Sequence, residues 1–119
     1  MKKAFLICPV RGHNPNHAND VVEKLENNGW IVHYPPRDTD QIDDTGYRIC
    51  LDNLQAISDA DKIFIFWDGK SQGSVFDAGM AFALNKPIEI VSVPDLIGEK
   101  SFQDMLAYWE RKKANKSHE

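Results

Sequence analysis

The stretch best equipped for chemistry is a run of polar and small residues that ends in one acid. Ser71, Gly73 and Ser74 precede Asp77, and the residues behind Asp77 are apolar almost without interruption as far as Asn85. Hydroxyl groups and free backbone amides at the start of a helix suit a phosphate or a sugar hydroxyl. One interpretation is therefore a ligand site with Asp77 aimed at the bound molecule.

The same acid also fits a structural role as a helix cap. Ser74 and Asp77 have the Ser-x-x-acid spacing of a capping box, and an acid in the first turn favours the positive helix end. Ser101 and Asp104 repeat this spacing before another expected helix, where nothing else indicates a function. Spacing alone favours the cap, and the polar residues around Asp77 favour the ligand site.

Length and composition limit the class of protein. The 119 residues, 42% hydrophobic and 27% charged, predict one globular domain over residues 1–119, with a polar tail from about residue 112. A net charge of -4 provides no broad basic field, which disfavours nucleic acid as the partner. A small ligand or a protein fits better.

The cysteines and histidines form no recognisable metal or disulfide pattern. Cys8 and Cys50 are interpreted as buried apolar residues in a reducing compartment, and His13 and His17 lack a third ligand at metal spacing. We expect no metal and no cofactor.

The first apolar run is too short and too interrupted for a signal peptide, and no segment approaches a membrane span. A cytoplasmic protein without membrane contact is predicted.

Four apolar runs alternate with helical patterns along the chain. Residues 4–8 and 62–67 are unbroken apolar runs typical of central parallel strands, whereas 30–34 and 87–93 are mixed and indicate edge strands. Helices are expected after Asn14, after Thr45, after Ser74 and from Ser101, the third of them apolar all round and therefore buried. This alternation predicts a three-layer, flavodoxin-like (Rossmann-like) α/β fold with strand order 2-1-3-4 and helices on both faces.

Ligands of such folds bind beyond the carboxyl ends of the strands, at the point where the strand order reverses. That point lies between the first and third strands, and the loops there read CPVRGHNPN and WDGKSQGS. Arg11 in the first loop can make a bidentate phosphate contact, or be an ordinary surface arginine. The site predicted from topology thus includes the stretch that ends in Asp77.

At these loops the sequence resembles the nucleoside 2-deoxyribosyltransferase superfamily. DGKSQGSVFDAGMAFALNKPI is similar to the family segment Gly-Ser/Thr-x-x-Glu-x-Gly-x-Ala-x-Ala, which carries the catalytic acid. CPVRG and SQGSVFD look closest to the 2'-deoxynucleoside 5'-phosphate N-hydrolases, which have a Ser-x-Arg-Gly loop and a Ser-x-Gly-x-x-x-Glu loop there. The resemblance covers the chain from Ala4 to about Val91.

The resemblance implies a role for each matching residue. Asp77 would be the catalytic carboxylate in place of the family's glutamate, and Asp52 the acid near the sugar and the leaving base. Arg11, Gly12, Ser71, Gly73 and Ser74 would form the substrate site, with Arg11, Ser71 and Gly73 at the phosphate. Without the resemblance, Asp52 is better explained as a solvated helix acid. The length of the loop 35–46, and not the resemblance, suggests that the loop forms a lid over the base together with Tyr34; a plain surface loop fits equally well.

The activity that follows from the resemblance is cleavage of an N-glycosidic bond in a nucleoside or nucleoside 5'-monophosphate, by hydrolysis or by deoxyribosyl transfer. A carboxylate stabilises or traps the oxocarbenium-like sugar in such reactions. The alternative is an inactive nucleotide-sensing or protein-binding domain of the same fold, which the change from Glu to Asp favours. A homo-oligomer, a dimer or larger, is expected in either case.

Overall fold

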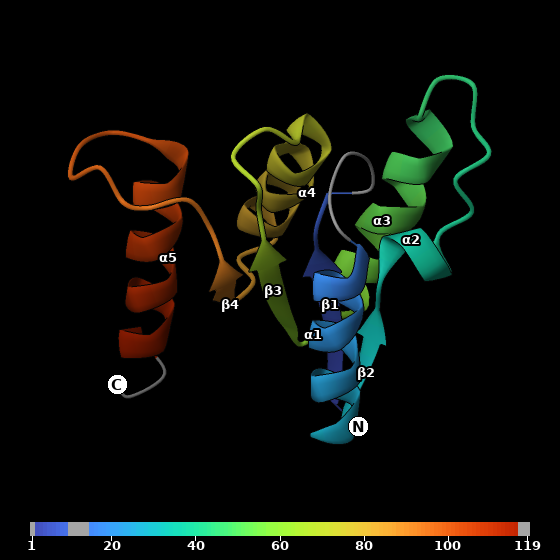
Figure 1. Ribbon diagram of the computed structural model, residues 1–119, viewed down its shortest axis with the longest axis horizontal. Coiled ribbons are helices and arrows are strands. Elements are labelled where there is room, and N and C mark those ends of the chain that lie inside the picture. The colour runs from blue at the N-terminus through green and yellow to red at the C-terminus, as the bar shows by residue number, and fades with distance from the viewer. Residues whose placement is uncertain (1, 10–14, 117–119) are drawn as a thin grey trace.

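The computed structural model describes residues 2–9 and 15–116. Its four strands are β1 (Lys2–Ile7), β2 (Trp30–His33), β3 (Lys62–Phe66) and β4 (Ile88–Ser92). They form one parallel sheet in the order β2-β1-β3-β4 (Figure 1). The strand order predicted from apolarity is confirmed.

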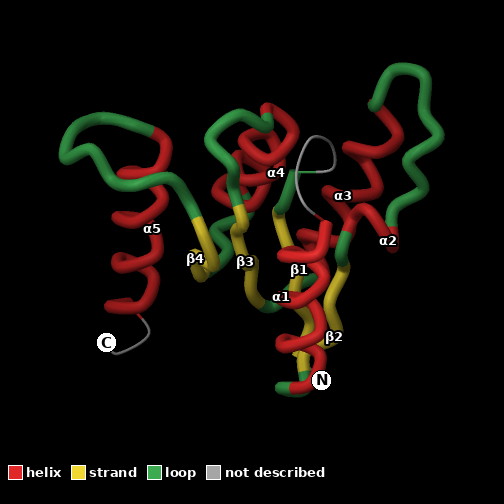
Figure 2. Tube along the Cα trace, in the orientation of Figure 1, coloured by secondary structure: helices red, strands yellow, loops and turns green. Residues whose placement is uncertain are grey.

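Within the described residues, five helices connect and flank the strands: α1 (Pro15–Asn27), α2 (Pro35–Asp38), α3 (Tyr47–Asp59), α4 (Gln72–Ala83) and α5 (Phe102–Lys116) (Figure 2). The short α2 occupies the start of the segment expected to be a loop. Prolines at its first positions, whose fixed φ angle suits a helix start, explain why it begins there. Helix α5 continues into the region expected to be a polar tail.

Alternating side chains of the central strand β1 divide the core into two halves. One half lies between the sheet and α1, and the other lies between the sheet and α3, α4 and α5. The first contains Ala4, Leu6, Ala18, Val22 and Phe64, and the second contains Phe5, Ile7, Ile57, Ile63, Ala78, Ala81 and Leu106. Because β1 and β3 are covered on both faces, their sequences are continuously apolar, as expected of central parallel strands.

The tryptophans lie against other aromatic rings. Trp30 packs edge-on against Phe64, Trp67 against Phe102, and Trp109 against Phe82. The indole N–H of Trp109 also donates to the carbonyl oxygen of Lys86 at 3.2 Å. These contacts place the three indoles in or next to the core.

The prediction of a fully buried α4 is wrong for the chain as described. Ser74, Asp77, Ala78 and Ala81 are buried on one side of the helix, whereas Val75, Phe76 and Phe82 on other sides are exposed. The described elements cover only the sides of α4 that face the sheet, α3 and α5. None of the described helices is both long and apolar enough to cross a membrane.

Candidate active site

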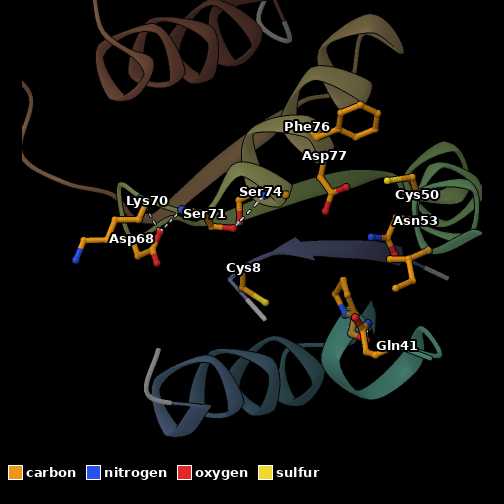
Figure 3. Close-up of a pocket in the computed structure, with 13 residues that line it drawn as sticks. Cys8, Gln41, Cys50, Asn53, Asp68, Lys70, Ser71, Ser74, Phe76 and Asp77 are labelled. Carbon is orange, nitrogen blue, oxygen red and sulfur yellow. Dashed lines mark hydrogen bonds between the residues drawn. The ribbon is translucent and has the colours of Figure 1, made fainter. Parts of the chain in front are cut away.

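A cavity of about 650 Å³ opens at the carboxyl ends of β1 and β3, where the topology predicted a ligand site. Its wall comes from the end of β1, the start of α2, the loop after α2, helix α3, the loop after β3 and the first turns of α4 (Figure 3). The residues that line it are Cys8, Pro35, Gln41, Ile49, Cys50, Asn53, Asp68, Lys70, Ser71, Gly73, Ser74, Phe76 and Asp77.

Asp77 is the buried acid of this cavity. Its side chain points from α4 into the cavity, and only 9% of the residue is exposed (Figure 3). Burial raises the pKa of Asp77 to about 7, and a side-chain hydrogen bond from Asn53 acts in the opposite direction. Asp77 therefore changes charge near neutral pH, as a functional carboxylate often does.

Helix α4 is capped by Ser71, and Asp77 takes no part in the cap. The hydroxyl oxygen of Ser71 accepts the backbone N–H of Ser74 at 3.2 Å and the hydroxyl of Ser74 at 3.0 Å. Asp77 consequently lies in the second turn, beyond the free amides of the helix start. The capping box between Ser74 and Asp77 is wrong, because the helix begins three residues before the position that this spacing required.

Asp104 shows what the same spacing does where it is a cap. Ser101 accepts the backbone N–H of Asp104 at 3.1 Å and donates its hydroxyl to the carboxylate at 2.9 Å. The carboxylate also accepts the backbone N–H groups of Ile97 and Gly98. These hydrogen bonds, that from Ile97 first, lower the pKa of Asp104. The fold thus raises the pKa of Asp77 and lowers that of Asp104, although both acids follow a serine at the same spacing.

The loop before α4 is held in place by its own hydrogen bonds. Asp68 accepts the backbone N–H groups of Lys70 and Ser71 at 2.8 Å each, and the indole of Trp67 donates to the carbonyl oxygen of Ser71 at 3.1 Å. In the first turn of α4, a Cβ atom added to Gly73 would meet no protein atom within 4 Å. The loop therefore presents a fixed helix start with open space beside Gly73.

Helix α3 contributes Asn53 to the cavity instead of the predicted Asp52. Asp52 is half exposed, pairs with Arg48 one turn earlier, and does not line the cavity. Asn53 is buried and lies beside Asp77. The available signal was helical spacing, because Asn53 falls on the same face as Cys50 and Ile57, and a polar residue on a buried face calls for a partner.

Both cysteines line the cavity, a position that their interpretation as core residues did not include. Burial and then the charge of Asp77 raise the pKa of Cys8 to about 12. Burial, Asp77 and Asp43 also raise the pKa of Cys50. Because the thiolate is the reactive form, neither cysteine is an effective nucleophile near neutral pH.

Tyr34 and the segment expected to form a lid lie differently from the prediction. Tyr34 does not line the cavity. It is buried in the core beneath α1, and the expected lid begins after it with Pro35 and Gln41 at the cavity wall. Gln41 donates to the carbonyl oxygens of Pro35 and Thr39 at 3.0 Å each, so this segment is tied to α2.

The other predicted residues belong to the loop after β1 and the start of α1. Arg11, Gly12 and His13 lie outside the described residues, and His17 is exposed on α1.

Among the described residues no three histidine, cysteine or acidic side chains gather in a way that could hold a metal ion.

Comparison with known proteins identifies the family. The model of the family described as nucleoside 2-deoxyribosyltransferase matches residues 5–100, which include the second half of β1, all of β3 and all the described residues that line the cavity. The chain belongs to this family. Asp77, Asn53, Ser71 and Gly73 all lie inside the segment matched to the nucleoside 2-deoxyribosyltransferase model.

A solved structure has the same fold as this family member. It is titled 2-desoxiribosyltransferase from Leishmania mexicana, and the superposition has a TM-score of 0.59 over 93% of this chain and 98% of that chain. The two sequences are 20% identical, so the likeness concerns the fold. No curated protein sequence matches this chain.

Proposed function

We propose that this protein cleaves the N-glycosidic bond of a nucleoside or nucleoside 5'-monophosphate, with Asp77 as the carboxylate that receives the sugar. The observation that carries the proposal is the buried Asp77, which titrates near neutral pH at the wall of a 650 Å³ cavity. Membership of the nucleoside 2-deoxyribosyltransferase family supports glycosyl transfer as the general reaction.

The proposed reaction starts from ionised Asp77. As the C1'–N bond breaks, its electron pair goes to the base nitrogen, and a carboxylate oxygen forms an ester bond to C1'. The base nitrogen takes a proton from a water molecule, which leaves hydroxide. In hydrolysis, the oxygen of a water molecule then adds to C1', the bond between C1' and the carboxylate oxygen breaks with its electron pair returning to Asp77, and the proton lost by this water neutralises the hydroxide. In transfer, the nitrogen of a second base adds to C1' in place of water, and its proton neutralises the hydroxide.

The leaving base has no second acid suited to protonate it in the described cavity wall. Partial burial acts to raise the pKa of Asp68, but the backbone N–H groups of Lys70 and Ser71 lower it overall, so Asp68 remains an anion. Asn53 stands where an acid was expected, and its amide donates a hydrogen bond without giving up a proton. We therefore assign Asn53 to binding and orientation.

For a 5'-monophosphate, the phosphate would lie at the start of α4. Ser71 and Gly73 line the cavity there, and Lys70 adds a positive charge. The helix start attracts anions through its free N–H groups and its dipole. Arg11 and Gly12, which the resemblance to the 5'-phosphate N-hydrolases assigns to the substrate, would approach from the loop after β1. Ser74, already bonded to Ser71, would support this site.

The test is release of free base from a panel of nucleosides and 5'-monophosphates, followed by chromatography, with and without a second base as acceptor. Base release by the wild type that is lost in Asp77→Ala supports the proposal, and a requirement for the acceptor base identifies transfer. Saturable nucleotide binding without release from any substrate would instead support the sensing or binding domain. Within residues 2–9 and 15–116, no second acid suited to proton transfer lies beside Asp77, and this favours that alternative.

We also propose that a second copy of the chain covers the exposed apolar side chains of α3 and α4. The two helices pack against each other, and both expose apolar residues: Tyr47, Leu51, Leu54, Val75, Phe76 and Phe82. An apolar face of this kind commonly marks an interface, and a symmetric dimer pairs the same face of each copy. Because Phe76 also lines the cavity, such a dimer would lie close to the site.

A further inference from the structure

A line of hydrogen bonds runs from the cavity to the edge strand β2. The hydroxyl of Thr39 donates to Oδ1 of Asn53 at 2.8 Å, and Nε2 of His33 lies 2.8 Å from the same hydroxyl oxygen. The other end of the Asn53 amide faces Asp77. Thr39 and Asn53 are each 5% exposed, so water does not compete freely for these bonds.

The direction of every bond in this line is fixed by its ends. Ionised Asp77 only accepts hydrogen bonds, so Asn53 must present its nitrogen to Asp77 and its oxygen to Thr39. Thr39 uses its proton on Asn53, and its oxygen must then accept from His33. His33 therefore carries a proton on Nε2.

Protonation of His33 does not reverse the direction of these hydrogen bonds. Burial lowers the pKa of His33, so the neutral ring predominates at neutral pH. In the protonated ring both nitrogens carry hydrogen, and Nε2 still donates. The line is therefore oriented in the same way in both charge states.

Each outer member is held by a contact of its own. The ring of His33 stacks on Phe5 with 5.3 Å between centroids and 7° between planes. The backbone N–H of Thr39 donates to the carbonyl oxygen of Pro35 at 3.0 Å. His33 thus holds the hydroxyl of Thr39, and that hydroxyl holds an amide that would otherwise be free to turn over.

We propose that Thr39 and His33 are positioning residues that hold the Asn53 amide with its nitrogen toward Asp77. They act through Asn53, and an amide passes no proton along the line, so the line orients the carboxylate without conducting protons. Without Thr39, Asn53 can turn its oxygen toward Asp77 and repel the ionised form. Only the consequence for turnover rests on the proposed function.

The experiment measures the pKa of the Asp77 carboxyl by ¹³C NMR titration, with Asp77→Asn to assign the signal. Removing the hydroxyl in Thr39→Val should raise this pKa by roughly 0.5–1 unit, the size of one hydrogen bond. Asn53→Ala should give at least as large a rise, and Thr39→Ser should restore the wild-type value. The double variant Thr39→Val with Asn53→Ala should match Asn53→Ala alone, because Thr39 acts only through Asn53.

Two further variants separate positioning from general damage. Thr45→Val removes the hydroxyl of the other threonine, which accepts the backbone N–H of Tyr47 outside the line, and should leave the pKa of Asp77 unchanged. His33→Phe keeps an aromatic ring on Phe5 but removes the donor, and should raise the pKa in the same direction as Thr39→Val. His33→Phe also serves as the test if Thr39→Val does not fold.

An unchanged pKa of Asp77 in folded Thr39→Val or His33→Phe, or a serine at position 39 that behaves like valine, would overturn the proposal. Where the wild type releases base, Thr39→Val should lower kcat with little change in KM. If no substrate is cleaved, the proposed function fails, while the NMR titration still decides whether Thr39 and His33 position Asp77.

Discussion

The hydroxyl oxygen of Ser71 accepts the backbone N–H of Ser74 at 3.2 Å, and this cap sets the start of α4. It places Asp77 one turn further on, where the helix needs no acid and where burial opposes its charge. An acid in this position lowers the stability of the fold whenever it is ionised. Natural proteins retain such groups chiefly where function requires them.

Asp77→Asn is therefore expected to stabilise the protein in a pH-dependent way. The pKa of Asp77 is near 7 in the folded state and near 4 when unfolded, so the wild type loses stability as pH rises from about 4 to 7. The neutral amide has no such loss. Urea unfolding should show a gain of roughly 1–3 kcal/mol at pH 8 and almost none at pH 4, with base release abolished.

Asp104→Asn is the matched control for this experiment. The fold lowers the pKa of Asp104. Its contribution to the free energy of unfolding is therefore present above the pKa of the unfolded state and is lost as pH falls through the pKa of the folded state. Asp104→Asn should lower the melting temperature at pH 8, show a smaller difference below pH 4, and keep wild-type turnover. Equal loss of stability in both variants with unchanged turnover would contradict the mechanism.

The pH dependence of base release should follow the ionisation of Asp77. Because the ionised carboxylate is the nucleophile, kcat/KM for a neutral nucleoside should rise with pH, bend near pH 7 and then level off. A nucleoside is the right substrate here, since it has no phosphate that titrates in this range. A rate that falls above pH 7 would instead assign Asp77 as a general acid, and a flat profile between pH 5 and 8 would exclude its raised pKa from the reaction.

The sequence was sufficient for the layers, the strand order and the end of the sheet at which the cavity opens. Continuous apolar runs distinguish β1 and β3 as central strands, and the order then places the loops after them together. The cap at Ser71 was not predicted, because Ser71 and Ser74 both fit an N-cap and only the path of the loop, fixed by Asp68, decides between them. Asn53 was missed because its role depends on partners from two other elements, Thr39 and Asp77.

Gly73→Ala should separate ligand binding from stability. A methyl group at Gly73 meets no protein atom, so the helix should tolerate or slightly gain from alanine, by up to about 0.5–1 kcal/mol. In the proposed site the methyl group would occupy space needed by the phosphate or sugar and weaken nucleotide binding by roughly tenfold or more. Calorimetric titration with nucleosides and with 5'-monophosphates measures binding, and thermal melts measure stability.

Gly79→Ala serves as the reference for that change. Gly79 lies on the same helix, a Cβ atom there is equally unobstructed, and it does not line the cavity. Its alanine variant should bind nucleotides like the wild type. If Gly73→Ala also binds like the wild type, the substrate does not approach the start of α4.

A charge on the apolar face of α3 should break the proposed dimer. Leu51→Glu places a carboxylate among exposed apolar residues that a second copy would bury, and sedimentation should then show a monomer where the wild type shows a dimer. Leu96→Glu is the control, because Leu96 is similarly exposed but lies in the loop after β4. A monomeric wild type at micromolar concentration would contradict the dimer.

The last prediction concerns the phosphate. If Arg11 binds a 5'-phosphate, Arg11→Ala should weaken binding of monophosphates by about 1.5–3 kcal/mol, the range of hydrogen bonds to charged groups, and leave nucleosides almost unaffected. Lys70→Ala should act in the same direction more weakly, because Asp68 beside it already offsets part of its charge. Arg111→Ala on α5 removes an equal charge away from the cavity and should change neither ligand. Calorimetry at two salt concentrations distinguishes a direct contact, which persists, from a diffuse field, which salt screens. Equal losses for monophosphates and nucleosides in Arg11→Ala would remove Arg11 from the phosphate site, and with it the main reason to place this protein beside the 5'-phosphate N-hydrolases.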